Sequence, residues 1–377
     1  GAALLAGHPP ERLASWFQEL PSDDAAALID ELPQAVSDAV LVQMRPRESG
    51  EVENLLEYAE QTAGRIMNPM VFALSEELTA GEAIQALQGS REVEMVFYLY
   101  VVDERRHLVG VVSLRRLLLV VPETPLGRIM TTDLISARVD TDQEEVAQSV
   151  ANYNLLAVPV VDEENKLVGI ITVDDVIDII KDEATEDIYR LAGVSGDEHV
   201  FSPARESMRK RLPWLGVNLV TATMAAFVVR AFQNTIDQVV MLAVLMTMVA
   251  SMGGNAATQT LTIIVRGIAL GELTWGNSRR ALFKEALVGF GHGLVLGSVG
   301  AGVAWLMSGN IFLGLILALA MVINLLVAAI AATLIPIALR AMKIDPALAS
   351  AVFITTLTDV FGFFAFLGLA TIFLPYL

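Results

Sequence analysis

The pattern of apolar and polar positions divides the chain near residue 200. Beyond that point, long, mainly apolar stretches run approximately over residues 213–233, 236–265, 281–307, 312–339 and 347–375. Each stretch is at least as long as the roughly 20 residues that cross the hydrocarbon core of a bilayer as a helix. The pattern therefore predicts a membrane protein whose residues 213–377 form an all-α domain of five transmembrane helices.

Before residue 200, the pattern is that of a soluble region built from short elements. Over residues 9–62, apolar positions recur at helical spacing, and Pro21 and Pro33 each mark the end of one helix and the start of another. This predicts a short α-helical N domain over residues 1–63. We expect that domain to be incomplete in this sequence, and residues 1–20 lack the pattern of a cleavable signal peptide.

An internal repeat follows the N domain. Met67-Asn68-Pro69 opens one copy and Met130-Thr131-Thr132 the other, and each continues through Val-Val-Asp-Glu to a Leu-Val-Gly strand. Segments of helical period lie between short β-branched strands, so each copy is an α/β unit of about sixty residues. The predicted domains are residues 64–128 and 129–190, joined to the membrane domain by residues 191–212.

Charge is distributed as unevenly as hydrophobicity. Residues 1–200 hold 37 of the 43 acidic residues and 14 of the 25 basic residues, whereas residues 201–377 hold 6 acidic and 11 basic residues. Such an acidic soluble half disfavours nucleic acid, which needs clustered Lys and Arg, and favours cations. The chain has no cysteine, and its four histidines have no metal-site spacing. With no phosphate-binding Walker loop either, we expect a passive transporter and not an enzyme.

Basic residues in the short loops predict the orientation of the spans. Lys and Arg precede the first span and lie between spans two and three and between spans four and five, whereas residues 234–237 and 308–310 contain none. Because such residues mark cytoplasmic loops, the amino terminus is expected in the cytosol and the carboxyl terminus outside the cytoplasmic membrane.

Asp359 is the residue that most directly suggests chemistry within the membrane. It lies thirteen residues after Pro346, or about 20 Å along a helix. A lone acid at this depth costs about 2.5 to 3.5 kcal/mol and is normally tolerated only beside a polar cavity or a partner. It could line a cation pathway, or it could be a protonated or hydrogen-bonded structural residue helped by neighbouring threonines. One carboxylate is a weak site for Mg²⁺, so we expect a homodimer that places two copies around one pore.

The second span contains a further polar segment. Gly253, Gly254 and Asn255 are followed by Thr258 and further hydrogen-bonding side chains at bilayer depth. This composition is consistent with a locally open helix that lines a wet cavity. Polar side chains that hold neighbouring helices together would explain it equally well.

The repeated α/β unit resembles a tandem pair of cystathionine-β-synthase (CBS) domains. Such pairs often bind adenine nucleotides through a Ser or Thr and an Asp after the Gly-containing strand. The second copy has Gly169, Thr172 and Asp175, whereas the first has Ser113 followed by Arg116 in place of the acid. The resemblance implies a single nucleotide site at Thr172 and Asp175, with ATP as a regulator. The alternative is that these two residues only cap the following helix.

Several motifs together resemble the MgtE family of magnesium transporters over nearly the whole chain. They are the acidic CBS pair, the segment Glu183–Ile188, five spans, Gly-Gly-Asn in the second span, and the run Asp345–Ser350 followed by Thr-Asp-Val. The family implies a homodimeric Mg²⁺-selective channel with regulatory Mg²⁺ bound to the N and CBS domains. It also implies a basic plug helix, here residues 202–212 with Ser202 as N-cap, that closes the pore.

Matching motifs assign roles to individual residues. The resemblance places pore Mg²⁺ at Asp359, with Thr355, Gly254, Asn255 and Thr258 in the pore wall. Asp23 and Asp24 match the N-domain contact to the regulatory ions less well. The remaining regulatory positions are acidic residues of the second CBS domain and of the run before the fifth span, namely Asp175, Asp178, Glu183, Glu186, Asp187 and Asp345.

The chain departs from the family pattern at a few positions. Many members have Gly-Gly-Asn-x-Gly-Asn-Gln in the second span, where this chain has Ala257 and Thr258. Asn154 and Ala351 stand where some relatives have Asp and Asn. Two other functions remain open at this point, namely a nucleotide-sensing membrane scaffold and a carrier for another divalent cation such as Mn²⁺ or Co²⁺.

Overall fold

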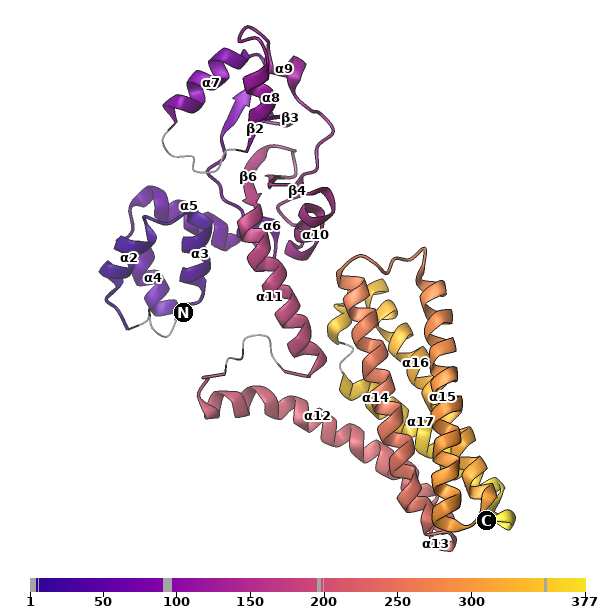
Figure 1. The fold of residues 1–377 in the computed structure, drawn as a ribbon. Coiled ribbons are helices and arrows are strands. Elements are labelled where there is room, and N and C mark those ends of the chain that lie inside the picture. The colour runs from indigo at the N-terminus through magenta and orange to yellow at the C-terminus, as the bar shows by residue number, and fades with distance from the viewer. Residues whose placement is uncertain (1–4, 6, 91–96, 195–197, 199, 349–350) are drawn as a thin grey trace. The chain divides into compact units, whose positions relative to one another are not determined.

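The computed structural model describes residues 5, 7–90, 97–194, 198, 200–348 and 351–377 (Figure 1). Contacts between residues divide the chain into two compact units, Gly1–Glu183 and Ala184–Leu377. The first contains the helical and α/β elements, and the second contains the long apolar helices.

The first unit begins with four short helices whose starts are set by proline. Pro21 and Pro33 occupy the N-cap positions of the second and third helices, as the sequence predicts, because a residue without an N–H costs nothing there. Leu13, Phe17 and Ile29 are almost fully buried between them. The four helices are α2 (Pro10–Phe17), α3 (Ser22–Asp30), α4 (Gln34–Gln43) and α5 (Pro46–Glu57).

Two three-stranded sheets with their helices form the rest of this unit, which confirms the predicted α/β repeat. In each sheet the outer strand pairs parallel with the central one, and the central strand pairs antiparallel with the third. The first repeat contains α6 (Ala63–Ile66), β1 (Ala73–Ser75), α7 (Ala80–Gly89), β2 (Tyr98–Val102), β3 (Leu108–Ser113) and α8 (Leu114–Leu119). The second contains α9 (Leu126–Ile129), β4 (Ala137–Arg138), α10 (Gln143–Tyr153), β5 (Ala157–Val161), β6 (Leu167–Thr172) and α11 (Val173–Leu191).

The repeated glycine in each copy explains how the two repeats join. A Cβ on Gly110 would overlap Sδ of Met130, which opens the second copy, and one on Gly169 would lie 2.6 Å from Sδ of Met67, which opens the first. Asn68 extends this exchange because it pairs with Ile170 through two backbone hydrogen bonds of 2.7 and 3.0 Å. Each copy is therefore completed by the first residues of the other.

The second unit contains the transmembrane domain. Among the described residues, five helices are long and apolar enough to cross a membrane, as predicted. They are α12 (Ala204–Ala231), α14 (Met241–Ala269), α15 (Ser278–Ser308), α16 (Ile311–Ala341) and α17 (Ala351–Ile372), and the short α13 (Gln233–Gln238), η1 (Pro346–Leu348) and η2 (Leu374–Tyr376) lie between or after them.

Three predictions about local structure were wrong in this unit. The basic segment 202–212 is not a separate helix, because α12 runs without a break through Pro213 into the first span. Its N-cap is Pro203 and not Ser202. Residues 234–237, expected as a loop, lie within α13.

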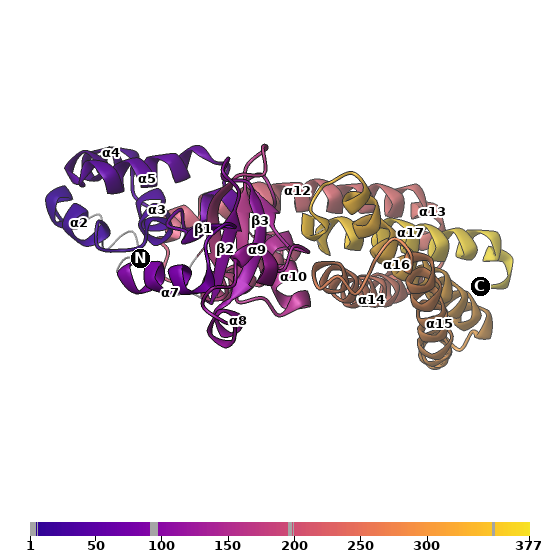
Figure 2. The same ribbon diagram turned by 90° about the horizontal axis from the view of Figure 1, so that it is seen from above.

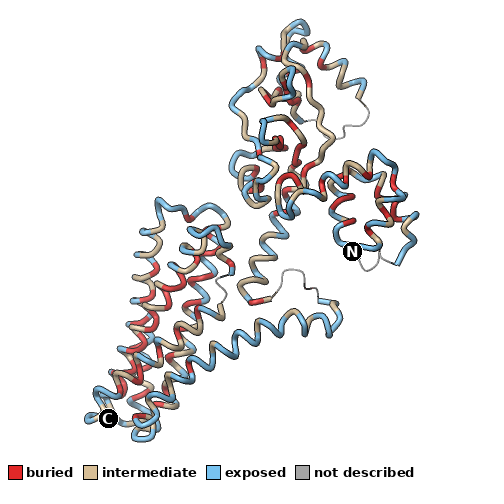
Figure 3. Tube along the Cα trace, turned by 180° about the vertical axis from the view of Figure 1, so that it is seen from behind, coloured by how far each residue is buried: buried red, intermediate tan, exposed pale blue. Residues whose placement is uncertain are grey.

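Small residues allow the transmembrane helices to pack closely. Gly289 and Gly297 of α15 lie so close to α16 that an added Cβ would approach the carbonyl oxygens of Leu325 and Ala318 to 2.7 and 2.9 Å. Figure 2 shows α14, α15, α16 and α17 packed together. Buried residues concentrate on these helices, whereas only Ala225 is buried among the described residues of α12 (Figure 3). The bundle core thus consists chiefly of α14, α15, α16 and α17.

Candidate cation-binding sites

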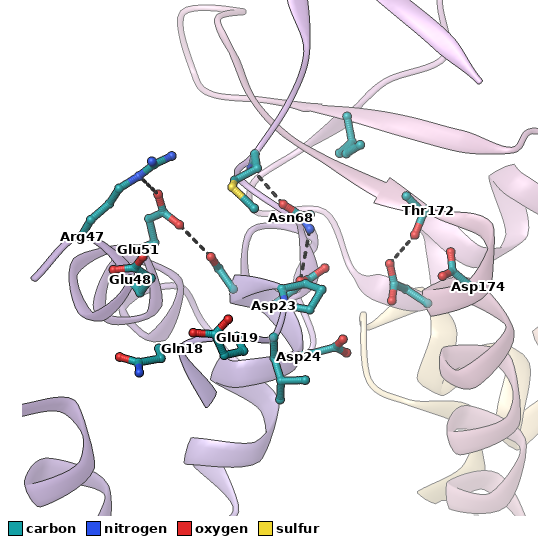
Figure 4. A pocket seen from close by; sticks show the side chains of 16 residues that line it. Gln18, Glu19, Asp23, Asp24, Arg47, Glu48, Glu51, Asn68, Thr172 and Asp174 are labelled. Atoms are coloured by element: carbon teal, nitrogen blue, oxygen red, sulfur yellow. Dashed lines mark hydrogen bonds and ion pairs between the residues drawn. The ribbon is translucent and has the colours of Figure 1, made fainter. Parts of the chain in front are cut away.

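An acidic cavity lies between the N domain and the second repeat of the first unit (Figure 4). Its volume is about 560 Å³. Seven carboxylates face it and Arg47 is the one basic residue among its described lining residues. The acidic residues are Glu19, Asp23, Asp24, Glu48, Glu51, Asp174 and Asp175.

Asp23 and Asp24 enter the cavity from the first turn of α3. A helix amino terminus favours negative charge, which suits acids at these positions. Asn68 donates a hydrogen bond of 3.3 Å from Nδ2 to Oδ1 of Asp23. Burial, and then the neighbouring charges of Asp175 and Asp24, raise the pKa of Asp23 to about 7. Near neutral pH, this carboxyl group is therefore divided between its two protonation states.

The opposite wall is formed where β6 passes into α11. Thr172 donates a hydrogen bond of 2.6 Å to Oδ2 of Asp175. Burial raises the pKa of Asp175 in spite of that bond, and burial together with the charges of Asp174 and Asp178 raises the pKa of Asp24. Acids from two distant parts of the sequence thus repel one another here, and a divalent cation would relieve that repulsion.

Sequence reasoning missed much of this cavity. It identified Asp23, Asp24 and Asp175, but not Glu19, Glu48, Glu51, Asn68 and Asp174. Asp174 adjoins a residue that had been selected, and Asn68 stands in a motif used only to define the repeat. Glu48 and Glu51 had no local signal, because α5 reaches the cavity only through tertiary packing. Among the described residues, no three His, Asp or Glu side chains are already arranged to hold one metal ion.

The other predicted regulatory acids of α11 have protein partners of their own. Oδ1 of Asp178 is 3.6 Å from Nζ of Lys181. Gln143 donates a hydrogen bond of 2.5 Å to Oε1 of Glu183. Asp187 lies on the same helix. The structure therefore distributes these acids along α11 and does not gather them at a single point.

Within the second unit, Arg190 connects two of the predicted acids. Its guanidinium forms ion pairs with Glu186 and with Asp345. Asp345 also accepts a hydrogen bond of 2.8 Å from the backbone N–H of Ala347, as a helix cap would. The end of α11 is thereby tied to the segment that precedes α17. Residues 349 and 350 of the predicted run lie outside the described residues.

Asp359 lies on α17, half-buried within the subunit, and makes no hydrogen bond or ion pair with the described residues. Thr355 stands one turn earlier and packs on α14, since a Cβ on Gly254 would lie 3.3 Å from its Cγ2. The hydroxyl groups of Thr355, Thr356 and Thr358 bind carbonyl oxygens of their own helix at 2.7 to 3.1 Å. These threonines therefore do not support the alternative that they stabilise the carboxyl group of Asp359.

The second span does not open at its glycines. Helix α14 is continuous from Met241 to Ala269, so the expectation of a locally open helix was wrong. Gly253 and Gly254 instead allow α16 and α17 to approach closely. Asn255 and Thr258 are exposed on the subunit, and the hydroxyl group of Thr258 bonds the carbonyl oxygen of Gly254 at 3.0 Å.

Three family models match the chain, and together they cover most of it. A divalent cation transporter model, MgtE, matches residues 246–369. The CBS domain model matches residues 63–123 and 126–182, and the MgtE intracellular N domain model matches residues 1–61.

Curated relatives agree with these models. The chain is 36% identical to the magnesium transporter MgtE of Bacillus subtilis, over 95% of this chain and 80% of that protein. It is 37% identical to the magnesium transporter MgtE of Enterococcus faecalis, over 87% and 73% of the two chains. The magnesium transporter MgtE of Thermus thermophilus is 37% identical, over 87% and 74%.

Among solved structures, the soluble part of a magnesium transporter is 39% identical, covering 48% of this chain and 71% of that chain with a TM-score of 0.46. The cytosolic domain of the Mg²⁺ channel MgtE in complex with ATP is 41% identical, covering 45% and 71% with a TM-score of 0.44.

Proposed function

Because the chain belongs to the MgtE family of magnesium transporters, we propose that two copies form a Mg²⁺-selective channel in the cytoplasmic membrane. Cytosolic Mg²⁺ closes this channel by binding to the acidic residues of the N and CBS domains. The chain is a multi-pass membrane transporter and not an enzyme. The observation that carries the proposal is the Asp359 carboxylate, which lies within an apolar helix with no partner among the described residues.

The chemistry around Asp359 suits a hydrated, doubly charged ion. Mg²⁺ prefers oxygen ligands and keeps several of its waters, so a few carboxylate, hydroxyl and carbonyl oxygens around the hydrated ion suffice. Gly254 and Thr355 bring α14 and α17 together one turn from Asp359, and we assign Asn255 and Thr258, which are exposed on the subunit, to the pore wall. A two-fold axis beside α17 would supply a second Asp359 and double the charge.

Regulation is proposed to act through repulsion between carboxylates. Asp23, Asp24 and Asp175 have raised pKa values because burial and mutual repulsion oppose their ionisation. Mg²⁺ bound among them would favour the arrangement with the N domain packed on the second repeat, since a ligand shifts an equilibrium toward the state that it binds more tightly. Further regulatory ions are assigned to Asp178, Glu183, Glu186, Asp187 and Asp345.

The remaining parts of the proposal concern topology. With basic residues in the loops after α14 and α16, the amino terminus lies in the cytosol and the carboxyl terminus outside. The functional parts are the N domain over residues 1–63, CBS domains over 64–128 and 129–190, the connecting region over 191–212 and the pore domain over 213–377. The first turns of α12, which hold Arg205, Arg209, Lys210 and Arg211, form the closing element.

ATP is the second candidate ligand, at Thr172 and Asp175. These side chains bond to each other at 2.6 Å, and Thr172 ends β6 where α11 begins. This geometry serves a helix cap as well as a ribose contact, so nucleotide is placed second, as a regulator of the channel. The remaining alternative is a carrier for Mn²⁺ or Co²⁺, and comparing the flux of these ions with that of Mg²⁺ would detect it.

The test is Mg²⁺ flux into liposomes that contain the purified full chain. Asp359→Asn keeps the size of the side chain but removes its charge, so we expect flux to fall to the level of protein-free liposomes. Asp237→Asn removes an acid from α13 and should leave flux within about twofold of wild type. Flux retained by Asp359→Asn, with unchanged selectivity, contradicts the proposal.

A further inference from the structure

One amide side chain lies buried at the centre of the transmembrane bundle. Asn324 belongs to α16 and is 1% exposed. Its neighbours on that helix are apolar, and its own helix provides none of its described hydrogen bonds. A polar group in this position is expensive unless other helices satisfy it.

The contacts of Asn324 reach both helices of the proposed pore. Its Nδ2 donates a hydrogen bond of 2.9 Å to the carbonyl oxygen of Val249 on α14. A Cβ on Gly253, one turn later, would overlap that nitrogen. On α17, a Cβ on Gly362 would lie 2.6, 2.9 and 3.1 Å from Nδ2, Cγ and Oδ1 of the same side chain. Asn324 therefore occupies a space that exists only because both facing residues are glycine.

Only half of the amide is satisfied. Oδ1 of Asn324 is buried and has no hydrogen-bond partner among the described residues. An apolar side chain of similar size would avoid that cost, so stability alone gives no reason for an amide here. Violations of this kind are expected where function constrains a position.

The two glycines adjoin the proposed ion pathway. Gly253 directly precedes Gly254, which packs on Thr355. Gly362 follows Asp359 by three residues, so the two lie on neighbouring turns of α17. Thr358, which directly precedes Asp359, is fully buried, and its Cβ lies 3.3 Å from the position of a Cβ on Gly253.

We propose that Asn324 is a positioning residue that sets α14 and α17 at a fixed separation, and thereby fixes the place of the Asp359 carboxylate in the pore. This inference rests on the proposed function of Asp359. The amide anchors α16 to α14 at Val249 and fills the space in front of Gly362. Asn324 does not contact the ion, and it acts through the placement of the two helices.

The test uses the size complementarity between Asn324 and Gly362. Gly362→Ala adds a methyl group, and all three of the nearest atoms to that group belong to Asn324. Asn324→Ala removes Nδ2 and Oδ1 and leaves space in front of Gly362. Because the two changes act on the same contact, the double variant should recover much of the function that each single variant loses.

Three quantities are measured in liposomes. They are the maximal Mg²⁺ flux per folded protein, the apparent KM for Mg²⁺ and the ratio of Mg²⁺ flux to Mn²⁺ flux. We expect each single variant to lower the flux ratio and raise the apparent KM by about tenfold, and the double variant to return to within about threefold of wild type. A loss of maximal flux alone would follow from poor folding and not from misplacement of Asp359. If Asn324→Ala does not give monodisperse protein, Asn324→Ser replaces it.

Controls separate this inference from the function beneath it. Gly302→Ala adds a methyl group to α15, where nothing lies within 4 Å, and should leave all three quantities unchanged. Wild-type flux that Asp359→Asn abolishes establishes the pore. With the pore established, an apparent KM and a flux ratio equal to those of wild type in both single variants overturn the role of Asn324. The role is also overturned if the double variant shows the product of the two single-variant changes instead of recovery. Unaltered flux in Asp359→Asn overturns the proposed function itself.

Discussion

At the scale of single residues, the acidic cavity is governed by proton binding as well as by metal binding. Burial and the charges of Asp175 and Asp24 raise the pKa of Asp23 from 3.8 to about 7. Between pH 3.8 and about 7, Asp23 therefore carries more bound proton when the N domain is packed on the second repeat than when the two are apart. In the absence of divalent cations, the contribution of Asp23 to the stability of this packing is fully present below pH 3.8 and is lost as the pH rises through about 7.

The first prediction at this scale is that protons and Mg²⁺ compete at Asp23. With a pKa of about 7, only about one molecule in ten is ionised there at pH 6. The Mg²⁺ concentration that half-protects the cytosolic half from proteinase K should be several-fold higher at pH 6 than at pH 8, with the activity of the protease checked on a denatured substrate. Asp23→Asn should remove most of that difference, whereas Asp30→Asn, further along α3, should keep it. Equal midpoints at the two pH values in wild type would contradict the prediction.

At the scale of elements, an ion pair joins Glu198, which precedes α12, to Arg211 on that helix, and the Arg211 side chain is 58% exposed. Glu198 is 5% exposed. Arg211, two turns into α12, donates to both of its carboxylate oxygens at 2.5 to 3.0 Å. Hydrogen bonds from Arg211 and Ser207 lower the pKa of Glu198. Glu198 is thus fastened to the first turns of α12 by a bidentate contact, the stronger kind of ion pair.

The second prediction concerns this fastening. If the first turns of α12 close the pore, Arg211→Gln should free them and raise by several-fold the Mg²⁺ concentration needed to inhibit flux. Arg209→Gln removes the same charge from the same helix but not the contact with Glu198, so its inhibition midpoint should stay near that of wild type. The measurement is flux at fixed external Mg²⁺ and varied Mg²⁺ on the cytosolic side. Equal shifts of the inhibition midpoint away from wild type in the two variants would show that the charge and not the ion pair matters.

How far the sequence specifies each element depends on whether its signal is local. The five spans and the α/β repeat follow from runs and periods within a few residues, and the structure confirms them. The roles of Gly253 and Gly254 were not predictable in the same way. The residue that requires glycine at position 253 is Asn324, which lies on another helix. Without knowledge of that contact, the sequence shows only two glycines that would weaken a helix. In the same way, α5 and α11 line the same acidic cavity only because of tertiary packing, so their sequences do not predict it.

At the scale of the whole molecule, charge and hydrophobicity are separated along the chain. Acidic residues greatly outnumber basic ones before residue 200, and basic residues outnumber acidic ones after it. Self-repulsion within the acidic part opposes compaction, and it weakens when cations bind or when salt screens it. A compaction that depends on specific Mg²⁺ sites must therefore be distinguished from one that any salt would cause.

The last prediction makes that distinction and tests nucleotide at the same time. The detergent-solubilised full chain is digested with proteinase K in three conditions. One contains Mg²⁺, one contains choline chloride at the same ionic strength, and one contains ATP without Mg²⁺. We expect millimolar Mg²⁺ alone to slow cleavage of residues 1–190 by at least tenfold, because a divalent ion offsets neighbouring carboxylates at a site where a monovalent ion only screens them. Asp175→Asn should weaken that protection, whereas Asp133→Asn, which lies outside the cavity lining, should not. Protection by ATP alone would favour the nucleotide-sensing scaffold, and equal protection by choline chloride would reduce the effect of Mg²⁺ to general screening.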